Sequence, residues 1–315
     1  RILPQYRALR GKLSGFKELV MTPDLAAEVT IQPIDELEVD AAIIFSDILV
    51  IPEAMGLDYD MVEKRGPVFP KTIQTIEEVK QLDSGQSAAE KLQYVFDALI
   101  ATKKGLNGRV PLIGFSGAPW TLLAYMIEGG GSKTFSQAKK FLYTQPETAH
   151  LLLQKITDTI IAYLRLKIDN GADVVQIFDS WSGILSPAQF ETFSLPYIHQ
   201  ICESITDTPK TVFAKGAWFS LEAMSDLPCQ TIGLDWNTDP QFARSKIGHD
   251  KIFQGNLDPC LLYSDHKNIE REAIAMIERF AGKHIANLGH GVYPDTPLEH
   301  VRTYVDTVKS FRYSE

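Results

Sequence analysis

Two short segments of the chain carry the residues whose types and positions could do chemistry. Residues 287–295 read Asn-Leu-Gly-His-Gly-Val-Tyr-Pro-Asp and place His290 between two glycines where a short apolar strand is expected to end. Residues 45–49 read Phe-Ser-Asp-Ile-Leu and deliver Asp47 within another apolar stretch. A carboxylate in an apolar surround costs free energy unless it is hydrogen-bonded, so we expect Asp47 to meet N–H donors or a developing cation. For His290, a glycine turn with a surface histidine is the plainer interpretation.

Other expected strands also end in polar residues, and most of these residues have a structural explanation. Asp235 and Asn256 are predicted to cap turns or helices, and Asp179 could equally cap the turn that follows it. Lys215 precedes a glycine and could form a Schiff base, but no carboxylate stands at a diagnostic spacing from it. The polar residues at expected strand ends are Asp47, Ser116, Asp179, Ser180, Lys215, Asp235, Asn256 and His290.

Seven apolar runs are predicted to be strands, with helical patterns between them. Most runs are nearly continuous, which indicates strands buried on both faces of a parallel sheet. Seven β-then-α units favour an α/β fold, a (β/α)8 barrel of the TIM type, as one domain over residues 1–315 with its first strand upstream of residue 1. An open doubly wound sheet is the alternative, although no Gly-x-Gly-x-x-Gly supports it. The predicted strands are Ala41–Ile51, Val110–Ala118, Asp173–Ser180, Thr211–Gly216, Thr231–Trp236, Lys251–Gly255 and His284–Gly289.

The ends of several helices can also be predicted. Apolar spacing predicts helices over Ala88–Thr102 and Glu147–Asn170. Ser186 precedes a proline and indicates a helix start, and Pro196 is expected to kink or end that helix. Thr296, followed by Pro-Leu-Glu, predicts a capping box that opens the last helix.

Composition and charge argue against several classes of function. The chain has 315 residues, 44% of them hydrophobic, and a net charge of −9 without a run of lysines or arginines, so we do not expect nucleic-acid binding. No apolar run reaches the roughly 18 residues that a membrane span needs. Cys202, Cys229 and Cys260 are few and far apart, which indicates a reducing, cytoplasmic compartment and disfavours a zinc site. A targeting segment upstream of Arg1 would not be visible.

Motifs along nearly the whole chain resemble those of the uroporphyrinogen decarboxylase family, in the same order. Arg1 and the five residues after it are similar to the end of the signature Arg-Gln-Ala-Gly-Arg-Tyr-Leu-Pro-Glu, with Ile2 in place of the usual tyrosine and Gln5 in place of the usual glutamate. The arginine that begins the signature, a candidate general acid in the family, lies before Arg1. The other similar blocks are 28–33, 45–49, 114–122, 125–130, 178–181, 193–197, 254–259 and 287–291.

The resemblance implies a (β/α)8 barrel that decarboxylates the acetate side chains of uroporphyrinogen III to methyls, giving coproporphyrinogen III. It implies no cofactor and no metal, because a protonated pyrrole of the substrate accepts the electrons released with carbon dioxide. Asp47 is the implied catalytic residue, which would bind pyrrole N–H groups and stabilise the cationic intermediate. A homodimer is implied as well. The implied substrate-binding residues are Arg1, Arg10, Asp47, Phe115, Tyr125, Phe178, Ser180 and His290.

Plainer roles and other functions stay open at this point. Tyr125, Phe115 and Phe178 could be core residues, and Arg10 could be a solvated helix charge. A corrinoid-dependent methyltransferase would share the barrel, but such relatives use a His-x-Cys zinc site, and Lys215-Gly216-Ala217 occupies the region where that pair is expected. A non-catalytic tetrapyrrole-binding protein is the other alternative, against which Asp47 argues.

Overall fold

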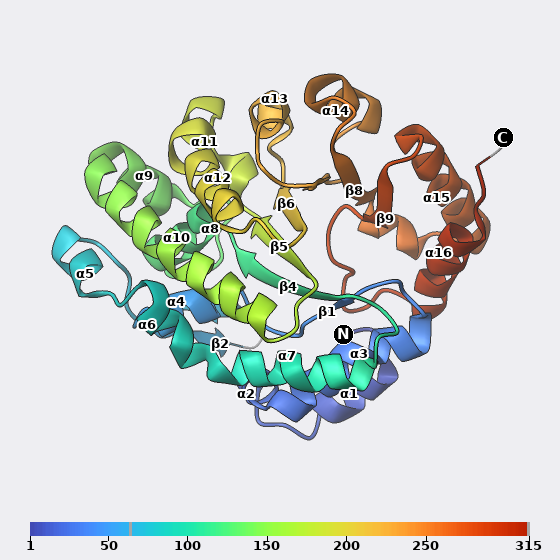
Figure 1. Cartoon of the computed structure of the whole chain (residues 1–315), viewed down its shortest axis with the longest axis horizontal. Coiled ribbons are helices and arrows are strands. Elements are labelled where there is room, and N and C mark those ends of the chain that lie inside the picture. The colour runs from blue at the N-terminus through green and yellow to red at the C-terminus, as the bar shows by residue number, and fades with distance from the viewer. Residues whose placement is uncertain (63–64, 314–315) are drawn as a thin grey trace.

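A curled parallel sheet forms the centre of the computed structural model, which describes residues 1–62 and 65–313. Seven strands follow the order β1-β4-β5-β6-β7-β8-β9, and every neighbouring pair is parallel. Helices surround the outside of the curl (Figure 1). This is the TIM-barrel-like arrangement that the sequence predicts. The strands are β1 (Ala42–Ile43), β4 (Leu112–Gly117), β5 (Val174–Asp179), β6 (Lys210–Ala214), β7 (Thr231–Gly233), β8 (Ile252–Leu257) and β9 (His284–Leu288).

Helices connect successive strands, and a small antiparallel pair, β2 (Asp60–Val62) and β3 (Gly66–Val68), stands apart from the main sheet. Within the described ranges, no helix is long and apolar enough to cross a lipid bilayer. The helices are α1 (Pro4–Arg10), α2 (Phe16–Met21), α3 (Pro23–Leu37), α4 (Val50–Ala54), α5 (Ile76–Gln81), α6 (Gly85–Ala89), α7 (Gln93–Leu106), α8 (Pro119–Glu128), α9 (Ser136–Thr144), α10 (Pro146–Asp169), α11 (Pro187–Phe193), α12 (Leu195–Ser204), α13 (Leu221–Met224), α14 (Pro240–Ile247), α15 (His266–Phe280) and α16 (Leu298–Ser310).

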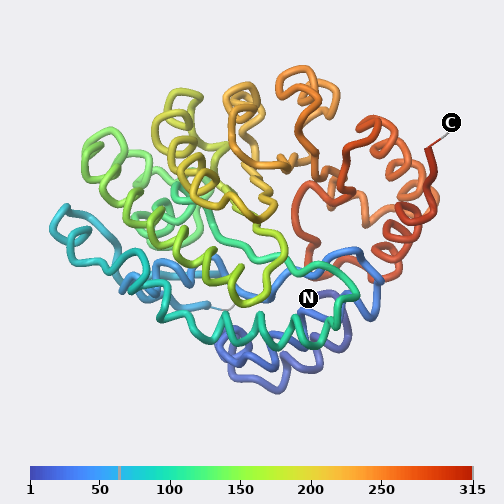
Figure 2. The backbone as a smooth tube through the Cα atoms, in the orientation of Figure 1, coloured from blue at the N-terminus to red at the C-terminus, as the bar shows by residue number. Residues whose placement is uncertain are grey.

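The two ends of the chain lie side by side. The guanidinium of Arg7 on α1 donates to the Pro294 carbonyl at 2.7 Å. Arg302 on α16 pairs with Glu36 on α3 at 3.2 Å. Figure 2 shows the corresponding blue and red segments next to each other. These contacts bring the first helices beside the last βα unit, so residues from both ends of the sequence can contribute to one site.

The inner face of the sheet is identified by one long-range hydrogen bond. Gln254 Nε2 on β8 donates to Gln176 Oε1 on β5 at 3.4 Å, although β6 and β7 lie between these strands. Both side chains therefore point across the inside of the curl. Side chains alternate along a strand, so Phe178 faces the same way as Gln176, together with its register partner Phe213. Phe115 is the register partner of Gln176 on β4 and also faces inward.

The predicted strands are confirmed, most of them with shorter bounds, whereas β8 ends two residues later than predicted. The largest correction falls on the first strand. The sequence predicts one strand over Ala41–Ile51, but β1 ends at Ile43 and a helix, α4, begins at Val50. Val50 and Ile51 are buried, but in a helical turn rather than in a strand. A short apolar run is compatible with either arrangement, so its hydrophobicity could not decide between them. The eighth strand of the predicted barrel stays a prediction.

Two of the predicted helix ends are confirmed and one is wrong. Ser186 and Gln189 form a reciprocal capping box at the start of α11, and the chain breaks between α11 and α12 just before Pro196. The capping box at Thr296 does not form, because Pro297 occupies the N-cap position of α16 in an extended conformation. The helix therefore starts one residue later than predicted, which leaves the Thr296 hydroxyl buried without a hydrogen-bond partner among the described residues.

The long helical patterns are confirmed. The pattern over Ala88–Thr102 corresponds to α7 with the end of α6 before it, and a 3-10 turn, Glu90–Leu92, joins the two. The pattern over Glu147–Asn170 corresponds to α10. α10 packs against β4 and β5 on the outer side of the sheet, so the side chains on its buried face can reach the strands that carry the site.

Candidate active site

Asp47 lies just beyond β1, on the carboxyl side of the sheet. The Leu49 N–H donates to its Oδ1 at 3.0 Å, and the Tyr59 hydroxyl is a further donor. Burial raises the pKa of Asp47 above its ordinary value, and these hydrogen bonds and the charge of Arg1 offset the rise only in part. The residue is nevertheless partly exposed. Asp47 is therefore a carboxylate in an apolar surround that a ligand can still reach.

Four tyrosines lie close enough to Asp47 for its charge to act on them. In Tyr59, Tyr94, Tyr125 and Tyr163, burial is the largest cause of a raised pKa, and the charge of Asp47 raises it further. These phenols are therefore protonated at neutral pH and can act as hydrogen-bond donors. Only Tyr125 was predicted from the sequence. The other three were missed because they lie on one loop and two different helices, with no motif of their own.

The two predicted arginines lie in different surroundings. Arg1 is near Asp47, since its charge lowers the pKa of that carboxyl. Arg10, at the end of α1, donates to the Leu13 carbonyl at 3.4 Å, and its charge lowers the pKa of Glu18 after the larger effect of hydrogen bonds to Ser14. The structure thus brings Arg1 and Asp47 together. It places Arg10 on the connection to α2, and its binding role stays a prediction.

Three phenylalanines form an apolar strip on the inner face. The ring centroids of Phe115 and Phe178 are 5.7 Å apart, and those of Phe178 and Phe213 are 6.1 Å apart. Phe115 and Phe213 are nearly buried, whereas Phe178 keeps more exposed surface. Phe213 was not predicted as a site residue. Its signal in the sequence was its place one residue before the end of a strand, which matches the place of Phe178 on β5.

The carboxyl end of β5 presents Ser180 and an aromatic cluster. Ser180 is partly exposed in the turn after the strand. Trp181, the next residue, stacks edge-on with Tyr125 of α8 at 6.4 Å, and its carbonyl accepts a 3.0 Å hydrogen bond from Trp120. The predicted residues Ser180 and Tyr125 are thus brought to one neighbourhood by the packing of α8 against β5.

Asp179, one residue before Ser180, faces outward from the sheet. It is fully buried, and the hydroxyls of Thr121 and Ser194 each donate to its carboxylate at 2.6 Å. Burial raises its pKa to about 6, against the lowering effect of these hydrogen bonds. Asp179 therefore ties β5 to α8 and to the junction of α11 and α12, and it makes no contact with the inner face.

His290 lies beyond β9 with a defined tautomer. The Gly291 N–H donates to Nδ1 at 2.7 Å, so the neutral ring carries its proton on Nε2 and offers an N–H donor there. The ring stacks on Trp236 at 6.3 Å and lies 6.5 Å from Phe213. Although the residue is exposed, the surrounding protein lowers the pKa of the imidazole, first by desolvation and then through the charge of Lys215. The Trp236 and Phe213 rings beside the imidazole account for this desolvation.

Lys215 is a cation that the sequence interpretation set aside. Its Nζ lies 5.4 Å from the ring centroid of Trp236 and 6.0 Å from that of Trp181. Both distances fall within the range of a cation–π interaction. Lys215 and His290 therefore form a second group of donors, beyond β6 and β9, that could bind carboxylates.

Asp235 and Asn256 have structural roles, as the sequence predicts. Asp235 is buried and accepts hydrogen bonds from the Gly216 and Asn237 amides. Asn256 Nδ2 donates to the carbonyls of Asp235 and Thr238 at 2.9 and 2.7 Å. Together they hold the loops after β6 and β7 and so support the segments that carry Lys215 and Trp236.

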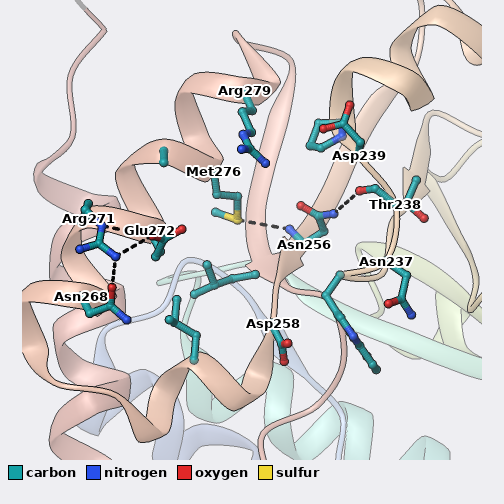
Figure 3. A pocket seen from close by; sticks show the side chains of 15 residues that line it. Asn237, Thr238, Asp239, Asn256, Asp258, Asn268, Arg271, Glu272, Met276 and Arg279 are labelled. Atoms are coloured by element: carbon teal, nitrogen blue, oxygen red, sulfur yellow. Dashed lines mark hydrogen bonds and ion pairs between the residues drawn. The ribbon is translucent and has the colours of Figure 1, made fainter.

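A cavity of about 610 Å³ lies beside β8, next to the loop that Asn256 holds. Asn256, Met276 and Arg279 line it, and α15 forms one of its walls (Figure 3). Apart from Trp236, its lining shares no side chain with the aromatic and charged groups around Asp47 and His290. Over the described parts of the chain, no group of three His, Cys, Asp or Glu residues could hold a metal ion.

The curled parallel sheet, with polar side chains gathered beyond the carboxyl ends of its strands, defines a TIM-barrel-like enzyme. A family model described as "Uroporphyrinogen decarboxylase (URO-D)" matches residues 1–311. The chain therefore belongs to the uroporphyrinogen decarboxylase family.

Comparisons with individual proteins agree with this assignment. The chain is 48% identical to a uroporphyrinogen decarboxylase of Salinibacter ruber, over 98% of this chain and 88% of that protein. It is 46% identical to one of Flavobacterium johnsoniae, over 99% and 91%. Among solved structures, a methyltransferase from Methanosarcina mazei superposes with a TM-score of 0.81 over 97% of this chain and 90% of that one, at 19% sequence identity. The last comparison shows a shared fold only.

Proposed function

We propose that this protein decarboxylates the acetate side chains of uroporphyrinogen III to methyl groups, yielding coproporphyrinogen III, as a cytoplasmic homodimer. The observation that carries the proposal is Asp47, a partly exposed carboxylate with a burial-raised pKa. Membership of the uroporphyrinogen decarboxylase family supports the choice of substrate.

Asp47 would act on the charge that develops in the ring. Protonation of a pyrrole carbon makes the ring cationic. The C–C bond to the carboxylate then breaks, its electron pair enters the ring, and carbon dioxide leaves. Protonation of the exocyclic carbon gives the methyl group, and loss of the proton first added to the ring carbon restores the neutral pyrrole. In the free protein, burial disfavours the ionised form of Asp47. Pyrrole N–H donors and a positive ring favour that form, so the interaction strengthens as the intermediate appears.

The remaining site residues would bind the two kinds of surface that the substrate presents. The strip of Phe115, Phe178 and Phe213 offers an apolar face for the macrocycle. The carboxylates at its edge need cations and donors, and the net charge of −9 means that only a local group can supply them. We assign this role to Arg1, Arg10, Tyr125, Ser180 and His290, as the sequence predicts, and to Lys215.

Anaerobic incubation of the full natural chain with uroporphyrinogen III tests the proposal. The products are oxidised and separated by their number of carboxylates. Stepwise loss of carboxylates down to the tetracarboxylate supports the decarboxylase. Tight binding of the porphyrinogen without any product favours a non-catalytic tetrapyrrole-binding protein. Neither binding nor turnover contradicts both ideas and calls for a metal analysis, since a corrinoid-dependent methyltransferase of this fold would carry zinc.

A further inference from the structure

The edge of β4 next to β1 has a carbonyl that the strand ladder leaves without its usual partner. The amides of Ala42 and Ile44 donate to the carbonyls of Pro111, just before β4, and Ile113, on β4, at 3.0 and 3.1 Å. By the same spacing, the next acceptor on this edge is the Phe115 carbonyl, and its partner in a longer ladder would be the Ser46 N–H. The register between β1 and β4 ends at Ile43, however. The chain after β1 thus leaves the sheet before Ser46 can donate to the Phe115 carbonyl, and Asp47 follows directly.

Lys167 fills the opening that this departure creates. Its Nζ donates to the Phe115 carbonyl at 2.8 Å, and it lies 4.7 Å from the centroid of the Phe115 ring and 4.3 Å from that of Tyr163. Lys167 belongs to α10, on the outer side of the sheet, where its Cδ would lie 3.2 Å from a Cβ placed on Gly114. The Phe115 ring is on the inner face. The side chain therefore reaches from the outer helix through the opening between β1 and β4.

The buried position of the Lys167 amine costs free energy of folding. Lys167 is fully buried, and its polar and ring contacts within the described part of the chain include no carboxylate. Burial lowers the pKa of its amine well below the ordinary value. Burying an amine costs free energy that one hydrogen bond and two ring contacts recover only in part. An apolar residue would avoid this cost, but it would leave the Phe115 carbonyl without a donor.

Lys167 contacts a residue on each side of the opening: Phe115 on β4, and Tyr163 beside the segment after β1. Phe115, its acceptor, lines the inner face. Tyr163, one turn earlier on α10, faces Ser46, and the charge of Asp47 contributes to its raised pKa. The hydroxyls of Ser46 and Tyr163 make no hydrogen bond of regular geometry with any described residue. The segment that carries Asp47 therefore lies against a wall formed by Tyr163, and Lys167 packs against that same ring.

We propose that Lys167 is a positioning residue for the decarboxylation: by occupying the opening at the Phe115 carbonyl, it keeps β1 splayed from β4 and holds Asp47 and the Phe115 ring in their working positions. This inference rests on the proposed function of Asp47. Lys167 itself does not touch the substrate. Its effect should fall on the chemical step, because a displaced carboxylate would stabilise the cationic intermediate less well.

Two substitutions separate the donor from the bulk of the side chain. Lys167→Met removes the N–H donor and shortens the side chain by one heavy atom. Lys167→Gln is shortened by the same amount but keeps an N–H donor, so the two variants differ in the donor at matched length. Turnover of uroporphyrinogen III is measured well below each melting temperature, where all variants are folded. We expect kcat of the methionine variant to fall about tenfold or more, with KM changed less than about threefold. The glutamine variant should stay within about threefold of wild-type kcat.

A second buried lysine provides a matched control. Lys210, at the amino end of β6, is also buried and donates to a backbone carbonyl, that of Ile205. Lys210→Met should lower the melting temperature and leave kcat unchanged. The inference is wrong if folded Lys167→Met keeps wild-type kcat, if Lys167→Gln is equally impaired, or if Lys210→Met loses as much kcat as Lys167→Met.

A further variant keeps the test decisive if Lys167→Met does not fold. Gly114→Ala would add a Cβ only 3.1 Å from Ala172 Cβ and 3.2 Å from Lys167 Cδ, so it displaces the lysine without removing it. We then expect lowered kcat for Gly114→Ala and near-wild-type kcat for Lys167→Gln, and the reverse pattern overturns the inference. An inactive wild-type protein would overturn the proposed function and the inference together. An active wild-type protein with an unaffected folded variant overturns the inference alone.

Discussion

Asp47 and Asp179 occupy similar places in the sequence and opposite places in the structure. Each follows or ends a strand of one parallel sheet, and burial raises the pKa of each. Asp179 faces outward, where the hydroxyls of Thr121 and Ser194 bind it. Asp47 lies where β1 has left the ladder, and it keeps part of its surface open. Burial alone therefore does not identify a catalytic carboxylate. What distinguishes the two is whether the surrounding protein satisfies the carboxylate fully or leaves it able to meet a ligand.

Removing the Asp47 carboxylate is expected to have the largest effect on activity. Asp47→Ala should lower kcat by at least about 10²–10³-fold, the usual loss when one preorganised stabilising group is removed. Asp47→Glu should retain part of the activity, since it keeps the charge. Porphyrin products separated by carboxylate number measure both. Asp47→Asn is the matched control for charge, and full activity in the alanine variant would remove the central claim.

Asp179→Asn should change stability as a function of pH rather than the chemistry. The native state holds the Asp179 proton more tightly than the unfolded chain, because its pKa is about 6 instead of the ordinary 3.8. The wild-type free energy of unfolding therefore falls as pH rises through this window and levels off above it. A pKa difference of this size corresponds to about 3 kcal/mol.

Denaturant titrations between these pH values check this prediction. The difference between wild type and Asp179→Asn isolates the one carboxyl from all the others that titrate. We expect the asparagine variant to gain stability relative to wild type as pH rises toward neutrality. A difference that stays constant with pH would mean that burial does not raise the pKa of Asp179 in the native state. A kcat loss as large as that of Asp47→Ala would end the contrast between the two residues.

His290→Ala should have a more modest effect than any change at Asp47. It removes one N–H donor among several for the substrate carboxylates, so kcat/KM should fall about tenfold, the range for one hydrogen bond to a charged group. His290→Gln can still donate and should recover part of the loss. Steady-state kinetics with uroporphyrinogen III measure both variants. A loss comparable to that of Asp47→Ala would move the main catalytic role to the other side of the site.

Apart from any loss of substrate binding, Lys215→Met should shift the titration of His290, the smallest of these effects. Because the charge of Lys215 lowers the pKa of the imidazole, after the larger effect of desolvation, removing it should raise that pKa. NMR titration of the His290 ring protons measures the change. Lys246→Met, which disrupts an exposed pair with Glu222, should leave the His290 titration where it is. An unchanged His290 titration in the Lys215 variant would mean that the charge of Lys215 does not act on the imidazole.

Much of the fold could be predicted because its signals are local. Each buried parallel strand is a short apolar run, and each helix has its own period and end signals, as at Ser186. The prediction was wrong where two structures satisfy the same local pattern. The run after Asp47 is buried equally well by a strand or by the turn and helix that the chain forms. The capping box at Thr296 does not form because Pro297 adopts an extended conformation and the helix starts at Leu298.

For the site, local patterns predict which residues stand at strand ends and that Asp47 has an apolar surround, and the motifs predict the family of the chain. The direction in which those residues face depends on tertiary packing. Packing explains four features that no local pattern predicts. They are the outward position of Asp179, the inward strip that includes Phe213, the proximity of Lys215 to His290, and the passage of Lys167 through the opening at Phe115. The physical reason is that a strand end has two faces, and long-range register and helix packing determine which side chain reaches the inner one.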